Sequence, residues 1–146
     1  MRLLGQKRFE VTVFDLVEPR ACKFIRGNLL DLNTVKDATR DFDTVIHLAA
    51  IPFDLPNDYK RLYDVNVTGT FHILEAASQN RVKKVIYASS ICALGVGFWK
   101  GTPIELQYFP VDEKHPAQPQ DLYGVSKLMG EKLCYMYTKR TGIRTI

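Results

Sequence analysis

The sequence predicts an α/β fold in which a doubly wound, parallel sheet lies between helices. Two observations lead to this prediction: short segments that are apolar throughout, and helical patterns that alternate with them. Strands without a polar face suit a parallel sheet that helices cover on both sides. The alternation favours right-handed crossover connections between parallel strands. A chain of 146 residues is long enough for its own core, so residues 1–146 are predicted as a single domain.

Five segments rich in β-branched and aromatic residues, with turn-forming residues between them, are predicted as strands. They are residues 11–15, 23–26, 44–48, 84–88 and a last strand that starts at Ile143. The segment 2–8, before the first strand, is interpreted as the end of a helix.

Two further segments show a helical period. Apolar or small residues recur every three or four positions between residues 62 and 76, and again between residues 122 and 136. That spacing places them on one face of a helix. Residues 92–120 follow neither a strand nor a helix period, so they are predicted as a long loop inside the domain. Loops of this length inside a compact domain are usually functional or mobile.

The composition is that of a globular domain, with 46% hydrophobic and 25% charged residues. Twenty Lys and Arg and sixteen Asp and Glu give a net charge of +4, but these charges are scattered, so no nucleic-acid partner is expected. The longest apolar stretch, residues 45–53, is far shorter than the roughly 20 residues of a membrane helix. Neither a membrane partner nor a signal peptide is predicted, and the expected location is the cytoplasm.

The cysteines and histidines indicate no metal site. The three cysteines, at positions 22, 92 and 134, are far apart and form no Cys-x-x-Cys pair. The three histidines, at positions 47, 72 and 115, show no ligand spacing with one another or with the cysteines. His47 and His72 are interpreted as packed or surface residues.

Tyr123 and Lys127 are the strongest candidates for chemistry. Their spacing of four, at the start of the last predicted helix, places both side chains on one face, one turn apart. A phenol has a pKa near ~10, too high for a base at neutral pH, and a neighbouring ammonium lowers that pKa by favouring the phenolate. Such a pair can act as a general acid or base. Any helix can place Tyr before Lys by chance, so the surrounding motifs decide between chemistry and coincidence.

Ser89 and Ser90 follow the predicted strand 84–88, so their hydroxyl groups are expected at the carboxyl end of a buried parallel strand. Ligands of open α/β sheets bind at this end. Serines at strand ends also form turns, which is the alternative for either residue alone. A strand, two serines, a long loop and a Tyr-x-x-x-Lys helix form a more specific pattern than any of these parts.

Four ordered motifs carry a family resemblance. They are VIHLAA at 45–50, NVTGT at 66–70, YASS at 87–90 with Gly95, and YGVSK at 123–127. Through these motifs the chain resembles the extended short-chain dehydrogenase/reductase family, the NAD-dependent epimerases and dehydratases of nucleotide sugars. Their fold is Rossmann-like, which agrees with the alternation of strands and helices described above.

The resemblance implies a catalytic set of Ser90, Tyr123 and Lys127. Tyr123 would be the acid/base that exchanges the hydroxyl proton of a sugar or nucleotide-sugar substrate during hydride transfer to NAD. Lys127 would assist Tyr123 and bind the nicotinamide ribose. Ser90 would hydrogen-bond the substrate hydroxyl or carbonyl group.

The resemblance also implies a set of cofactor-binding residues. They are Asp15, Asn28, Leu29, Ala49, Ala50, Asn66 and Lys127. Asp15 ends the first predicted strand, where the family places an acidic residue against the adenosine ribose, and a carboxylate there repels the extra phosphate of NADP. NAD is therefore the expected cofactor. A guanidinium near this position, such as that of Arg20, can reverse the preference, and an arginine of a surface loop is the alternative interpretation of Arg20. Asn28 stands where the family has Asp, and its amide oxygen can still accept from adenine.

Ala49, Ala50 and Asn66 have structural alternatives. Two small alanines would let the backbone approach the cofactor closely, with ordinary close packing as the alternative. Asn66 lies on an otherwise apolar helix face, where an amide needs a partner. In similar enzymes this asparagine fixes the backbone of the neighbouring strand.

The family opens with a strand and a Gly-x-x-Gly-x-x-Gly turn whose helix holds the cofactor pyrophosphate, and this chain contains neither. The smaller C-terminal region that selects the sugar in similar enzymes is also missing. The chain is therefore interpreted as an incomplete NAD-binding domain, truncated at both ends. Loss of two amide contacts at roughly 2 kcal/mol each predicts weak or lost NAD binding.

The absent strand is the centre of the sheet in the order 3-2-1-4-5-6. The strands that end near Asp15 and Leu48 would therefore lack the strand between them, and unpaired inner strands are unstable. Either these two strands pair directly, or a second copy of the chain supplies the contact in a homo-oligomer, or the natural protein is longer.

Three functions stay open from the sequence. The first is an NAD-dependent nucleotide-sugar epimerase or dehydratase, or an inactive fragment of one. The second is a non-catalytic α/β remnant that works as an oligomeric interaction module or a weak nucleotide-binding module. The third is a sugar or uronate dehydrogenase, which oxidises its substrate without a later epimerisation step.

Overall fold

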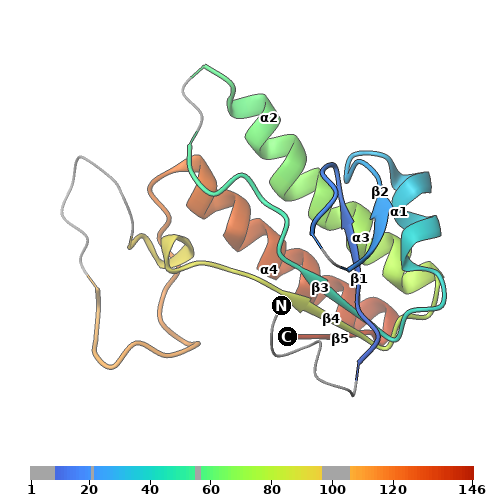
Figure 1. Ribbon diagram of the computed structural model, residues 1–146. Coiled ribbons are helices and arrows are strands. Elements are labelled where there is room, and N and C mark those ends of the chain that lie inside the picture. The colour runs from blue at the N-terminus through green and yellow to red at the C-terminus, as the bar shows by residue number, and fades with distance from the viewer. Residues whose placement is uncertain (1–8, 21, 55–56, 97–105) are drawn as a thin grey trace.

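The computed structural model describes residues 9–20, 22–54, 57–96 and 106–146, and the predicted helix end at 2–8 lies outside them (Figure 1). The strands are β1 (Thr12–Asp15), β2 (Lys23–Arg26), β3 (Thr44–His47), β4 (Lys84–Tyr87) and β5 (Arg144–Thr145). The helices are α1 (Leu32–Thr39), α2 (Tyr59–Tyr63), the π-helix η1 (Asp64–Thr68), α3 (Gly69–Gln79), the 3-10 helix η2 (Ile91–Leu94) and α4 (Leu122–Thr141).

All described strand pairs are parallel, as predicted. β1 pairs with β2, with Thr12 opposite Lys23, and β4 lies between β3 and β5. Among the described residues no strand pair joins β1 to β3, so the direct pairing that the sequence left open is not found. The fold is thus built on two small parallel sheets, one of two strands and one of three.

The described helices pack together as one layer. α1 packs against α3, and α3 packs against α4 (Figure 1). Side chains alternate along β3: Val45 packs against the core, whereas Ile46 is 40% exposed. The parallel α/β fold is confirmed, and in the part of the chain that is described its helices cover one face of the three-stranded sheet.

One hydrophobic core lies between this helix layer and the strands. Its buried residues are Leu29, Val35, Ile73, Leu74, Ala76, Ala77, Val82, Val85, Cys134, Tyr137 and Ile143. Leu29 packs closely on α3, because a Cβ at Gly69 would lie 2.4 Å from its side chain. This contact connects the β1–β2 part of the chain to the long helices.

α2, η1 and α3 follow one another without a break, which confirms the helical period of residues 62–76. The π-helix η1 in the middle contains Asn66, which is 2% exposed. A π-turn holds one residue more than an α-turn and occurs frequently at functional sites. The polar residue predicted on this helix therefore lies at the one irregular turn of the described segment.

Candidate active site

Lys127 is buried at the carboxyl end of β4. Its side chain is 4% exposed, and Nζ donates to the carbonyl oxygen of Ala88 over 2.7 Å. The ammonium lies 5.1 Å from the ring centre of Tyr87 and 5.7 Å from that of Tyr123. Both distances allow a cation–ring attraction. Burial lowers the pKa of Lys127 from its ordinary value.

Tyr123 stands in the first turn of α4, one turn before Lys127. Its N–H donates to Asp54 Oδ1 over 2.9 Å, and its carbonyl accepts from Ser126 Oγ over 2.7 Å. The structure thus brings the ammonium of Lys127 to the ring of Tyr123, as the spacing predicts. Their chemical roles stay predictions.

Ser90 follows β4 and caps η2, where its Oγ accepts from the N–H of Cys92 over 3.2 Å. η2 lies against the first turn of α4, because a Cβ at Gly124 would lie 2.4 Å from the carbonyl oxygen of Cys92. Gly124 neighbours Tyr123, so the segments of Ser90 and Tyr123 meet. Together with Lys127, the predicted catalytic residues come from segments that converge where parallel sheets bind ligands.

Ser89 has a different partner from Ser90. Its Oγ donates to Oε1 of Glu131, an exposed residue of α4 one turn beyond Lys127. Ser89 therefore connects the end of β4 to α4. Of the two adjacent serines, Ser90 is the one beside η2 and the first turn of α4.

A buried polar network lies next to Lys127. Nε2 of His47 is 3.0 Å from Oγ1 of Thr70, whose hydroxyl donates to the carbonyl oxygen of Asn66 over 2.6 Å. Because a hydroxyl has one proton, His47 donates from Nε2. Burial, and secondarily the charge of Lys127, lowers the pKa of His47 to about 4. His47 is therefore neutral at pH 7. Its exposure of 4% shows that it is a packed residue and not a surface residue.

Asp15 and Asn28 lie close together at the carboxyl edge of the β1–β2 sheet, since Gly27 N–H donates to the carbonyl oxygen of Asp15 over 3.1 Å. Both side chains are exposed, and each accepts from the backbone N–H two residues further on. Leu29 differs, because it is 9% exposed and packs against Gly69. An open carboxylate and amide fit the hydroxyls and adenine of the adenosine half of NAD.

Ala49 is exposed and Ala50 is half-buried, and both directly follow the loop end of β3. Asn66 reaches the same loop: Oδ1 accepts from Ile51 N–H over 2.8 Å, and Nδ2 donates to Ile51 O and to Ser126 Oγ, each over 3.0 Å. The amide is therefore fully engaged within the protein, in agreement with a role in fixing the backbone. Contact of these three residues with a cofactor stays a prediction.

Sequence reasoning missed three residues of this site: Asp54, Ser126 and Tyr87. Ser126 and Tyr87 lie within the YGVSK and YASS motifs. The motifs did not indicate that the Ser126 hydroxyl bridges Asn66 and Tyr123, or that the Tyr87 ring lies beside Lys127. The partner of Asp54 is 69 residues away in the sequence. No local pattern connects positions so far apart.

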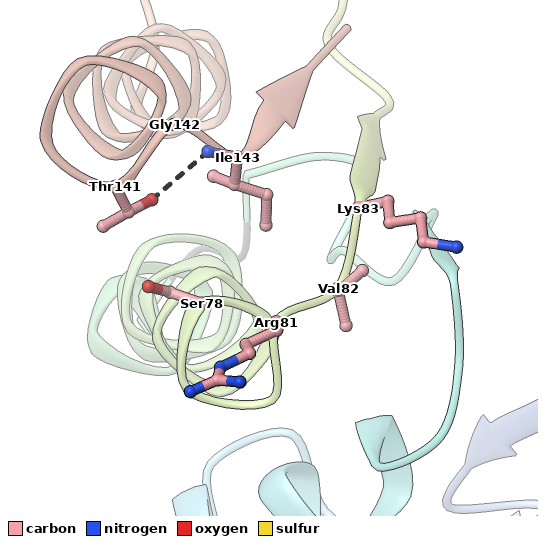
Figure 2. A pocket seen from close by; sticks show the side chains of 7 residues that line it. All are labelled: Ser78, Arg81, Val82, Lys83, Thr141, Gly142 and Ile143. Atoms are coloured by element: carbon pink, nitrogen blue, oxygen red, sulfur yellow. Dashed lines mark hydrogen bonds between the residues drawn. The ribbon is translucent and has the colours of Figure 1, made fainter.

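Neither a metal centre nor a second candidate site emerges from the remaining described residues. Among them, no group of three His, Cys, Asp or Glu side chains could hold a metal ion. In the same part of the chain, no helix is long and apolar enough to span a membrane. The described residues also form a cavity of about 230 Å³. Figure 2 shows the residues that line it: Ser78, Arg81, Val82, Lys83, Thr141, Gly142 and Ile143. It lies where α3 and α4 end and β4 begins, at the opposite end of β4 from Ser90.

Comparison with known proteins agrees with this geometry. The sequence profile of the NAD dependent epimerase/dehydratase family matches residues 1–146. A uronate dehydrogenase from Pseudomonas syringae pv. tomato is 33% identical over 146 residues, which are 100% of this chain and 48% of that protein. A putative UDP-glucose 4-epimerase from Methanocaldococcus jannaschii is 34% identical over 131 residues, which are 87% of this chain and 40% of that protein.

A similar solved structure is that of a short-chain dehydrogenase/reductase superfamily protein from Agrobacterium tumefaciens with bound NAD. Its TM-score is 0.87 and its sequence identity is 31%, over 99% of this chain and 42% of that chain. The likeness confirms the Rossmann-like fold and the resemblance drawn from the four motifs. The chain spans less than half the length of each of these three proteins.

Proposed function

The chain belongs to the NAD-dependent epimerase/dehydratase family, and from this premise we propose that it takes part in NAD-dependent oxidation of a hydroxyl group on a sugar or nucleotide sugar. The observation that supports this most is the convergence of the segments of Ser90, Tyr123 and Lys127 at the carboxyl end of β4. The NAD-bound protein of similar fold supports NAD as the cofactor.

The residues present fit NAD. When bound, the cofactor supplies the carbon that accepts the hydride. Asp15 and Asn28 would hold the adenosine half, and Ala49 and Ala50 would let the backbone come close to it. An ammonium has three N–H donors, and Lys127 uses one on Ala88, so further donors can reach ribose hydroxyls.

The proton of the substrate hydroxyl passes to Oη of Tyr123 while a hydride leaves the substrate carbon that bears this hydroxyl. The nearby ammonium of Lys127 stabilises the negative charge on the phenol oxygen before that oxygen takes the proton. Ser90 Oγ already accepts from Cys92 N–H, so its own proton is available to the substrate oxygen. Tyr123 acts as the acid/base and Ser90 orients the reacting oxygen.

Replacement of one hydroxyl group tests this assignment. Tyr123→Phe keeps the ring and removes the proton carrier, and general acid–base catalysis contributes roughly 10²–10⁴-fold to rates. We expect turnover to fall by at least about 100-fold, measured as NADH formed from D-glucuronate and as UDP-galactose formed from UDP-glucose. Tyr135→Phe is the matched control, because Tyr135 lies on the same helix and is 64% exposed. Equal turnover of the two variants would exclude Tyr123 as the acid/base.

The two probes separate the two substrate classes named among the relatives. A uronate dehydrogenase accumulates NADH with D-glucuronate, whereas a 4-epimerase returns the hydride and converts UDP-glucose without net NADH. The relative from Pseudomonas syringae favours the dehydrogenase, since its match covers the whole chain.

A non-catalytic nucleotide-binding module is the second candidate. The sequence contains no Gly-x-x-Gly-x-x-Gly turn, and the two sheets share no strand pair among the described residues. Both observations favour weak NAD binding by this chain alone. Calorimetric titration with NAD tests it: binding without turnover of either probe would support the module and contradict the enzyme.

The same proposal includes self-association. α3 and α4 pack side by side, and both expose large apolar side chains, with Phe71 at 38%, Tyr135 at 64% and Met136 at 36% exposed. A second copy of the chain could bury these side chains, which supports a homo-oligomer.

A further inference from the structure

The main chain of Tyr123 is held on both sides, and both connections lead to one loop. Its N–H donates to Asp54 Oδ1 over 2.9 Å. Its carbonyl accepts from Ser126 Oγ, which accepts from Asn66, and Asn66 pairs with both backbone groups of Ile51. Ile51 and Asp54 lie in the loop between β3 and α2. The hydrogen bonds therefore close a ring around the backbone of Tyr123.

Most of this ring of hydrogen bonds is shielded from water. Asn66 is 2% exposed, Ser126 is fully buried and Asp54 is half-buried. Hydrogen bonds are stronger where water does not compete, and a carboxylate acceptor strengthens them further. The ring is therefore a firm connection between the first turn of α4 and the loop after β3.

The start of α4 already has a local cap. Asp121 accepts from the N–H of Gly124 over 2.6 Å, and so satisfies one of the free N–H groups of the first turn. Asp54 adds a second carboxylate from a different segment of the chain. The helix can begin at Asp121 without Asp54, but only Asp54 joins the backbone N–H of Tyr123 to the β3–α2 loop.

We propose that Asp54 is a positioning residue for Tyr123. It holds the first turn of α4 against the loop after β3 and thereby sets where the phenol meets the substrate. This inference rests on the proposed function, in which Tyr123 carries the substrate proton. Misplacement of a reacting group by about 1 Å can cost about 100-fold in rate. Asp54 acts through the backbone of Tyr123, not on the reacting atoms.

Three variants of the full chain separate positioning from stability. Asp54→Ala removes the acceptor of Tyr123 N–H. Asp54→Asn removes the charge but keeps an oxygen acceptor of the same reach. Asp121→Ala is the matched control, because it removes the other carboxylate from the same helix turn without touching the N–H of Tyr123. For each variant, kcat and KM for NAD are measured with D-glucuronate and UDP-glucose as probes, beside the urea midpoint.

We expect kcat of Asp54→Ala to fall by about 10–100-fold with KM for NAD changed by less than about threefold. Asp54→Asn should restore kcat to within about threefold of the parent chain, because the hydrogen bond is kept. Asp121→Ala should lower the urea midpoint at least as much as Asp54→Ala, with kcat within about threefold of the parent. Equal losses of kcat in the two alanine variants would overturn the positioning role, as would a failure of Asp54→Asn to restore kcat.

Hydrogen exchange at the amide of Tyr123 checks the geometry independently of turnover. Exchange should be faster in Asp54→Ala and unchanged in Asp54→Asn, and equal exchange in all variants would contradict the hydrogen bond itself. The proposed function is tested separately by Tyr123→Phe. If that variant loses turnover while Asp54→Ala behaves like Asp121→Ala, the positioning role alone fails. If Tyr123→Phe turns over like the parent, or the parent turns over neither probe, the proposed function fails and the positioning role with it.

Discussion

Lys127 is a buried cation held by a carbonyl oxygen and two aromatic rings. Among the described residues it forms no ion pair with a carboxylate. Ala88 accepts from its ammonium, and the rings of Tyr87 and Tyr123 lie within cation–ring distance. A carboxylate partner would neutralise this charge at close range. Because no carboxylate takes part in these contacts, the positive charge stays available to the phenol oxygen of Tyr123, which is negative before it takes the substrate proton.

The neutral, buried state of His47 makes stability depend on pH. The pKa of His47 is about 4 in the folded chain and near 6.5 in an unfolded one. The unfolded state therefore takes up a proton first as the pH falls, and stability present above pH ~6.5 is lost between pH ~6.5 and ~4, by about 3 kcal/mol.

His47→Gln should remove this dependence, because the replacement does not titrate in that range. The measurement is the free energy of unfolding from urea titrations at about pH 7.5, 5.5 and 4.5, above and within the interval in which His47 gains its proton. We expect the parent chain to lose more stability than the variant over this range. Parallel losses in the two chains would contradict a depressed pKa of His47.

Single residues differ in how far the sequence predicts their place in the site. Tyr123 and Lys127 are four positions apart, so helical geometry alone brings them together. The place of Ser90 follows from the rule that parallel strands gather ligand-binding residues at their carboxyl ends. Asp54 could not be predicted, since its contact depends on how the β3–α2 loop returns to α4. A contact of this kind depends on tertiary packing and has no periodic signature.

At the scale of elements, the close packing of η2 against α4 depends on the absence of a side chain at Gly124. A Cβ there would lie 2.4 Å from the carbonyl oxygen of Cys92, and a backbone atom cannot rotate away as a side chain can. Gly124→Ala should therefore push η2 from α4 and lower the free energy of unfolding by about 1–3 kcal/mol.

Gly142→Ala is a control for the glycine substitution itself. Gly142 ends α4 with φ of +78° and nothing near its Cβ position, so alanine there costs backbone strain of about 1–2 kcal/mol without moving η2. The measurement that distinguishes the two variants is the native-state labelling rate of Cys92, which is 6% exposed. Labelling of Cys92 should be faster in Gly124→Ala than in the parent chain and unchanged in Gly142→Ala. Equal rates in both variants would contradict the packing of η2 against α4 at Gly124.

The elements themselves were predicted where their apolar pattern is dense. The strand 23–26 agrees with β2 to the residue, and the other strands agree within one residue at their described ends. α1 was missed, because of its eight residues only Val35 and Thr39 are buried, which is too few for a visible helical period. Its start signal is Asp31, whose side chain accepts from two N–H groups of the first turn. The π-helix was missed too, since it does not interrupt the run of apolar residues.

At the scale of the whole molecule, the two sheets are connected through helices rather than through shared strand bonds. Leu29, which follows β2, packs on α3 at Gly69, and α3 packs on α4 beside the three-stranded sheet. In this helix layer, α4 carries the exposed side chain of Tyr135. The arrangement of the whole domain therefore depends on the layer that would also carry the contact between subunits.

Self-association through α4 predicts a mass in solution of at least twice 16.7 kDa. Tyr135→Glu should return the chain to a monomer, because a charge in an apolar interface costs desolvation energy. Light scattering during size-exclusion chromatography measures the mass. Phe9→Glu is the matched control, because it places the same charge at an equally exposed aromatic residue outside α3 and α4. A monomeric parent chain would contradict the proposed homo-oligomer.

The π-helix between α2 and α3 has a consequence for insertions and deletions. Because its turn holds one residue more than an α-turn, the π-helix accommodates that residue without rotating α2 about its axis relative to α3. Deletion of Val65 would therefore let the segment become a regular α-helix in which α2 keeps its facing and Leu62, which is fully buried, stays in the interior. The deletion would instead remove the widened turn that contains Asn66, the residue whose amide pairs with Ile51. One codon therefore separates the native segment from a more regular helix that lacks this turn.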